Sequence, residues 1–176
     1  MQDFYRLIVA WQPFFISLAA ISATLVGLLF VAISLHPGGS DPGGKANLQR
    51  LAQHTFADFV QVLFVGFFLS VPEMVPTFYG AAMLLIVAVS LRPVWVQLSA
   101  AWRDRIHAPH RQHLLRRLGL SLLGRVLLLV GAGELLLLQP NLGTVRQSVF
   151  FVFSGSVVLL ISAMRNAWFL LLQDLE

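Results

Sequence analysis

The chain has 176 residues, of which 57% are hydrophobic and only 11% are charged, and its mean hydropathy is +0.79. Soluble domains carry roughly 25% charged residues. The composition therefore indicates an integral membrane protein, with residues 1–176 forming one domain and too little polar sequence for a second, soluble one. The sequence has no cysteine, which excludes disulfides, thiol catalysis and thiolate metal sites.

Five apolar segments in chain order predict an all-α bundle of transmembrane helices. A helix needs roughly 17–25 apolar residues to cross the hydrocarbon core, and each connection between the segments contains proline, which ends helices. We expect crossings at 13–35, 55–71, 77–98, 118–138 and 145–167. Residues 1–6 lack the positive start of a signal peptide, so we expect the first segment to remain in the mature protein.

A basic connection at 103–117 sets the expected orientation. It holds five of the twelve Lys and Arg residues, namely Arg103, Arg105, Arg111, Arg116 and Arg117. Short connections rich in these residues stay in the cytoplasm. The sequence thus predicts a cytoplasmic basic loop, an outside N-terminus and an inside C-terminus. We expect these cations to contact anionic lipid headgroups rather than nucleic acid. Four crossings, with the second segment on the surface, would place Lys45 and Arg50 outside, which the same rule disfavours.

Small residues recur on one face of the first and last segments. Ala19, Ala23 and Gly27 are spaced by four residues in the first segment. In the last, the spacing is seven and the residues are Ser148, Gly155 and Ser162. Small side chains let another helix approach closely, so both stripes are predicted to be packing faces on which a partner can dock.

Asp58 and Arg125 are opposite charges placed at the same expected depth. Asp58 lies fourteen residues from Pro72, and Arg125 lies thirteen from Leu138. At the helical rise, both are about 20 Å below the outer surface. An unpaired charge in lipid costs several kcal/mol, so we predict an ion pair between the second and fourth segments. Three roles stay open for it: a structural clamp, part of a polar path or ligand pocket, or side chains that snorkel to the inner surface.

Glu134 is expected near the outer end of its segment, level with Glu73 and Arg146. One interpretation is an outer ion pair with Arg146. The other is an entry site for a cation or proton, formed with Glu73. If the chain forms a transport path, we expect Thr24 and Gln61 to line it together with the intramembrane charges.

The sequence contains no complete motif for catalysis or for binding a cofactor. Residues 39–45 match the phosphate-loop pattern G-x-x-x-x-G-K, but Ala46 replaces the hydroxyl residue that holds magnesium, and a membrane helix rather than a strand precedes the loop. His107, His110 and His113 are spaced by three, but Pro109 and neighbouring arginines argue against a metal site. We consequently expect no metal, no cofactor and no enzymatic activity.

Two motifs resemble those of a family of small bacterial integral membrane proteins. The first is A-T-L-V-G-L-L-F-V-A-I-S at 23–34, and the second is N-A-W-F-L-L at 166–171. The resemblance covers the first and last helices and implies a location in the bacterial inner membrane. Some members of the family are labelled as modulators of a membrane-bound ATP-dependent protease. No catalytic residues come with it.

Two functional classes follow from these observations. The first is a non-enzymatic accessory or regulatory subunit, expected to be a homo-oligomer, that acts through helix contacts with a membrane protein partner. The second is a subunit of an oligomeric ion channel or small-solute transporter, with a polar path near Asp58, Arg125 and Glu134.

Overall fold

Five helices make up nearly all of the described chain. The computed structural model describes residues 2–35, 42–71, 75–103, 108–137 and 142–172. Within these ranges the helices are α1 (Gln2–Leu35), α2 (Pro42–Ser70), α3 (Pro76–Arg103), α4 (Ala108–Leu137) and α5 (Leu142–Leu172). The all-α prediction is confirmed.

Four helices are long and apolar enough to cross a membrane. Their candidate spans are Arg6–Ser34, Leu51–Ser70, Gly119–Leu137 and Gly143–Leu170. The described side chains of α3 add a shorter apolar stretch, Thr77–Arg92. The architecture is that of a multi-pass membrane protein.

The helices extend well beyond the expected crossings. α1 begins at Gln2 rather than near residue 13, and α2 begins at Pro42. The basic run 103–117 was predicted to be a loop, and this was wrong for most of it, because α3 continues to Arg103 and α4 begins at Ala108. Pro109 is the second residue of α4. Proline is tolerated in a first helical turn because its missing N–H would have no partner there in any case.

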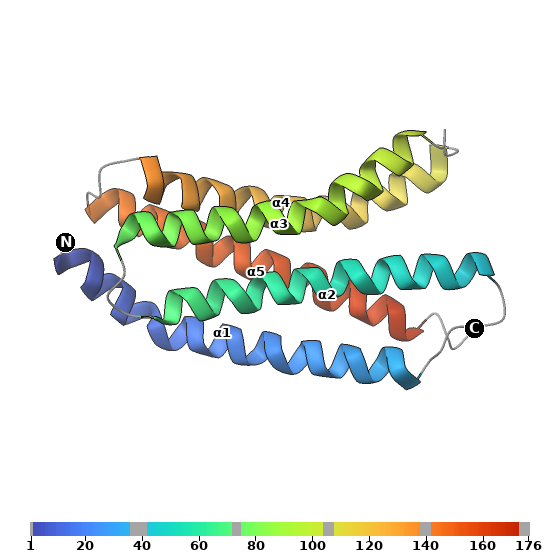
Figure 1. Cartoon of the computed structure of the whole chain (residues 1–176), viewed down its shortest axis with the longest axis horizontal. Helices are drawn as coiled ribbons and strands as arrows, with labels where there is room; N and C mark the ends of the chain where they lie inside the picture. Colours follow the sequence, from blue (N-terminus) through green and yellow to red (C-terminus); the bar gives the residue numbers. More distant parts are fainter. Residues whose placement is uncertain (1, 36–41, 72–74, 104–107, 138–141, 173–176) are drawn as a thin grey trace.

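The helices alternate in direction, and four of them surround a common interior. In Figure 1, α1 and α2 lie on one side and α3 and α4 on the other, with α5 between them. α2 contacts α3 and α5, and α4 contacts α3 and α5, so these four form a ring. α1 packs outside the ring, against α2 and α5. We call the end where α2 and α4 begin the basic end, because α3 finishes there at Arg103.

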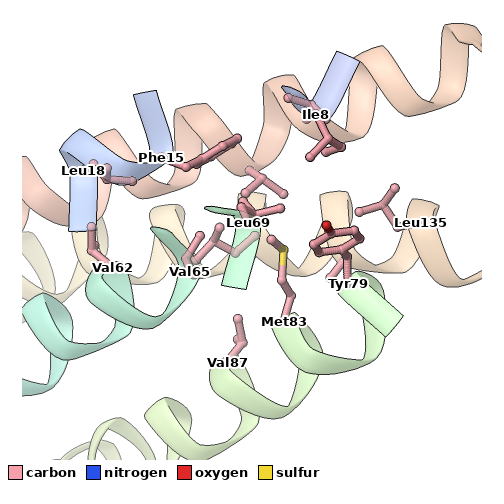
Figure 2. Packing of buried hydrophobic residues seen from close by; sticks show 14 of the residues in the cluster. Ile8, Phe15, Leu18, Val62, Val65, Leu69, Tyr79, Met83, Val87 and Leu135 are labelled. Carbon is pink, nitrogen blue, oxygen red and sulfur yellow. The ribbon is translucent and has the colours of Figure 1, made fainter. Parts of the chain in front are cut away.

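The half of the interior away from the basic end is mostly apolar, with Ser148 and the partly buried Glu134 as exceptions. Figure 2 shows Val65 and Leu69 of α2 packed with Tyr79 and Met83 of α3, while Phe15 of α1 closes the cluster from outside. α4 and α5 complete this core with Leu128, Ala132, Leu135, Val145, Val149, Val152 and Leu159. Aliphatic and aromatic side chains therefore fill the bundle across all five helices.

Toward the basic end, buried polar residues appear on each helix of the ring. They include His54, Thr55, Asp58 and Gln61 of α2, Ser90 of α3, Ser121 and Arg125 of α4, and Ser156, Ser162 and Asn166 of α5. The interior thus changes from apolar to largely polar at one level of the bundle. A small apolar cluster, formed by Leu29, Phe59 and Ala163, packs beside this polar half.

The small residues of α5 pack against α4 of the same chain. A Cβ on Gly155 would lie 2.8 Å from the carbonyl oxygen of Gly124, and one on Gly131 would lie 2.9 Å from that of Ser148. α4 and α5 consequently approach more closely than larger residues would allow. Ser148, Gly155 and Ser162 are all buried in this structure. The prediction that this stripe is a helix-packing face is confirmed at Gly155 and Ser148, which pack against α4. The further expectation that the stripe is open to a partner was wrong.

In the small-residue stripe of α1, Ala19 is packed against α2, whereas Ala23 and Gly27 are exposed. Ala19 packs against α2, where a Cβ on Gly66 would lie 2.9 Å from the Ala19 backbone nitrogen. Ala23 and Gly27 are exposed, and nothing lies within 4 Å of a Cβ built on Gly27. The part of the stripe nearer the basic end therefore remains open on the surface of the bundle.

Candidate functional site

A buried ion pair joins α2 to α4 at the edge of the polar half. The Nη2 atom of Arg125 lies 2.5 Å from Oδ1 of Asp58, and the two side chains are 1% and 0% exposed. The pair predicted from matching depths is present. Because α2 and α4 are not neighbours in the ring, the long arginine side chain makes this connection by reaching across the interior.

Two serines complete the coordination of the pair. Ser121 lies one helical turn before Arg125 on α4, and its Oγ is 2.9 Å from Oδ2 and 3.1 Å from Oδ1 of Asp58. Nη1 of Arg125 donates to the same Oγ, and Nε donates to Oγ of Ser90 on α3 at 3.4 Å. A single guanidinium group thereby holds three helices together.

His54 is a site residue that the sequence reasoning missed. It lies one turn before Asp58 on α2, is buried, and places Nδ1 3.4 Å from Oδ2 of Asp58. This is a close polar contact without the alignment of a hydrogen bond. The spacing of four residues between a histidine and an aspartate on one helix face was the available signal. The carboxylate therefore has an arginine on one side and an imidazole on the other.

Burial determines how this cluster behaves. Moving two charges out of water costs several kcal/mol per ion, which good geometry and additional hydrogen bonds offset. Here both charges have such partners, and neither is accessible to solvent. The cluster therefore joins α2, α3 and α4 through side chains that are closed to solvent in this structure.

Gln61 lies beside the cluster inside the bundle, whereas Thr24 faces away from the bundle. Gln61 lies one turn beyond Asp58 and is 2% exposed, and neither atom of its side-chain amide has a hydrogen-bond partner among the described residues. Thr24 is exposed on α1 and its hydroxyl donates to the carbonyl of Ala20 at 2.9 Å. The expectation that Thr24 faces the same polar path was wrong, because it lies on the outer surface of the helix outside the ring.

At the opposite end, Glu134 has a different partner from the one expected. Its Oε2 accepts a hydrogen bond from Oγ of Ser148 at 2.9 Å. Arg146 is exposed, and no ion pair joins it to Glu134 in the described chain. The predicted Glu134–Arg146 pair was therefore wrong: Arg146 lies on an exposed face of α5, and the described partner of the carboxylate is the hydroxyl of Ser148. The apolar core separates Glu134 from Asp58.

Several predicted residues lie outside what the structure describes. Glu73 is outside the described residues, as are Arg105 and His107. The backbone of α3 and α4 includes further residues whose side chains are not described, namely Arg103, His110, Arg111, His113, Arg116 and Arg117. Among the described residues, no group of three or more His, Asp or Glu side chains could hold a metal ion.

Comparisons with known proteins return no relative. No family model matches the chain, and neither a curated protein nor a solved structure is found to match it. The resemblance of the first and last helices to a bacterial membrane protein family consequently stays a prediction, and function has to be argued from the site.

Proposed function

We propose that this chain is a non-enzymatic accessory or regulatory subunit of the bacterial inner membrane, which acts through helix contacts and assembles as a homo-oligomer or with a membrane protein partner. In the proposed orientation the N-terminus is outside and the basic end faces the cytoplasm, as the positive-inside rule favours.

The observation that carries this proposal is the sealed Asp58–Arg125 pair. The two charges that best fit a transport path are closed against one another, with exposures of 0% and 1%. On one side of them, the described interior is filled by residues such as Val65, Met83 and Leu128. A solute moving through one copy would have to displace this core. A clamp that orders the helices accounts for the same geometry without such a displacement.

The open part of α1 supports an action through helix contacts. α1 lies outside the ring, and Ala20, Ala23 and Gly27 are exposed along it. Small residues on a lipid-facing helix allow the backbone of a second helix to come close, and the resulting van der Waals contacts drive association in a bilayer. The face of α1 at 20–27 is therefore the proposed contact surface.

Bulky side chains on this face provide the test. Ala23→Leu combined with Gly27→Leu should leave the fold intact, because both positions are open to the surroundings, but should block a close helix approach. Light scattering in nanodiscs and affinity purification from native membranes measure the assembly. Val89→Leu on the exposed face of α3 is the matched control.

We expect the wild-type protein either to form a particle larger than one chain or to purify with a stoichiometric partner. Only the double variant should lose this assembly. A wild-type chain that is monomeric and without a partner in both measurements contradicts the proposal.

A transport role is the second candidate, and the unpaired buried polar atoms favour it. Gln61, Ser162 and Asn166 each bury at least one side-chain atom without a hydrogen-bond partner among the described residues. Native proteins seldom leave such groups unsatisfied, and a path that opens from the basic end would supply water or a solute to them. Proton or ion flux into liposomes that Asp58→Asn abolishes would support this role. Silent liposomes at both polarities of membrane potential would argue against it.

A further inference from the structure

A groove between α1 and α5 lies at the end of the bundle opposite the basic end. It is a half-open depression of about 830 Å³ and is lined by Leu7, Trp11, Gly143, Arg146, Gln147 and Phe150. Both helices begin at this end (Figure 1). Pockets that bind small molecules typically measure roughly 300–1,000 Å³, so the groove is large enough for one sizeable ligand.

The polar side of the groove is positive. Arg146 is exposed, and no carboxylate pairs with it in the described chain. The described partner of Glu134 is Ser148. α5 begins at Leu142, so Arg146 lies in its second turn. The free N–H groups of a first helical turn and the helix dipole attract an anion to the same place. A cation and a helix N-terminus therefore act together on one side of an open groove.

The rest of the groove lining is mostly apolar and aromatic. It includes Leu7 and Phe150, and Trp11 packs edge-on against Phe153 of α5 with 5.4 Å between ring centroids. Trp11 lies close to the end of α2, since the neighbouring Gln12 donates a hydrogen bond to the carbonyl of Ser70 at 2.8 Å. Tryptophan is characteristic of the level at which lipid headgroups meet acyl chains. The groove thus joins a cation to an apolar wall at the depth of the membrane interface.

We propose that this groove binds an anionic phospholipid from the leaflet at this end of the bundle. The phosphate lies at Arg146 and the first turn of α5, and an acyl chain runs along Leu7 and Phe150. Charge complementarity selects the headgroup, because the described lining residues include a cation and no acidic side chain. The assignment is independent of the proposed function and requires only that the chain lies in a bilayer.

Tryptophan quenching by brominated lipids tests the assignment directly. The chain has four tryptophans, so Trp95, Trp102 and Trp168 are replaced by phenylalanine to leave Trp11 as the only reporter. The full chain is reconstituted with trace brominated phosphatidylglycerol or brominated phosphatidylcholine in phosphatidylcholine vesicles. A membrane-surface cation favours an anionic headgroup by about fivefold, so phosphatidylglycerol should quench Trp11 at about fivefold lower concentration.

Two cation variants distinguish a site from general attraction. Arg146→Gln should remove the preference for phosphatidylglycerol. Arg6→Gln removes an exposed cation from the same end of α1 that is not among the lining residues, and it should leave the preference unchanged. Equal quenching by the two lipids in the Trp11-only protein overturns the proposal, as does an equal loss of preference in both variants. Loss of the preference on adding inorganic phosphate overturns it too, because that result assigns the groove to a soluble anion.

Discussion

Arg125 of α4 reaches Asp58 of α2 across the centre of a four-helix ring, with 2.5 Å between Nη2 and Oδ1. The two helices are held together by these side chains rather than by close packing of their backbones. Ser90 of α3 accepts a hydrogen bond from the same guanidinium, so the strength of the bundle in its polar half depends strongly on one residue.

Replacing one partner of the pair should therefore be more damaging than replacing both. Arg125→Leu leaves the Asp58 carboxylate buried without a counter-charge, and removing one partner of a buried pair typically costs about 3–5 kcal/mol. Asp58→Leu combined with Arg125→Leu leaves no uncompensated charge, so the double variant should be more stable than Arg125→Leu alone. Unfolding in mixed micelles measures both. Additive losses in the double variant would show that the two side chains act separately.

The close α4–α5 contact predicts that Gly155→Ala and Gly27→Ala change the free energy of unfolding in opposite directions. Gly155→Ala places a methyl group 2.8 Å from the carbonyl of Gly124, and overpacking of this kind costs about 1–3 kcal/mol. Gly27→Ala adds the same methyl group where nothing lies within 4 Å. That change should stabilise helix α1 by up to about 1 kcal/mol. The free energies of unfolding of the two variants should move in opposite directions, and a shift of the same sign in both contradicts the contact.

Removing the hydrogen bond between Ser148 and Glu134 should destabilise the protein less than Arg125→Leu does. Ser148→Ala removes the described donor to this partly buried carboxylate, and the expected loss is about 1–3 kcal/mol. In the Ser148→Ala background, Glu134→Gln removes the unsatisfied charge and should recover part of that loss. Thermal unfolding of the three variants measures it. If Ser148→Ala leaves the stability unchanged, the Glu134 carboxylate is hydrated and does not depend on the serine.

Single cysteines test the proposed orientation without background labelling, because the natural sequence has none. Met74→Cys lies in a connection expected to be outside, and Ser40→Cys lies in one expected to be inside. A membrane-impermeant maleimide added to intact spheroplasts should label Met74→Cys alone, and should label Ser40→Cys after permeabilisation. The reverse pattern would invert the topology and move the proposed lipid groove to the cytoplasmic leaflet.

The matching levels of Asp58 and Arg125 along the bundle could be predicted from the sequence. A helix rises by a constant 1.5 Å per residue, so counting from the connections placed Asp58 and Arg125 together, and their ion pair is present. The same count brought Glu134 and Arg146 to one level, but they do not pair. Depth alone does not state toward which neighbour a side chain is directed.

Hydropathy by itself determined that this chain is a set of membrane-spanning helices, because only a helix satisfies every backbone group of an apolar segment in lipid. Which face of each helix is turned inward was decided by the tertiary structure: His54 beside Asp58, Thr24 on the outside, and Gly155 against α4. The physical reason is that lipid is as apolar as a protein core. Leucine and valine consequently appear on both faces of a membrane helix, and their pattern cannot distinguish an inward side chain from an outward one.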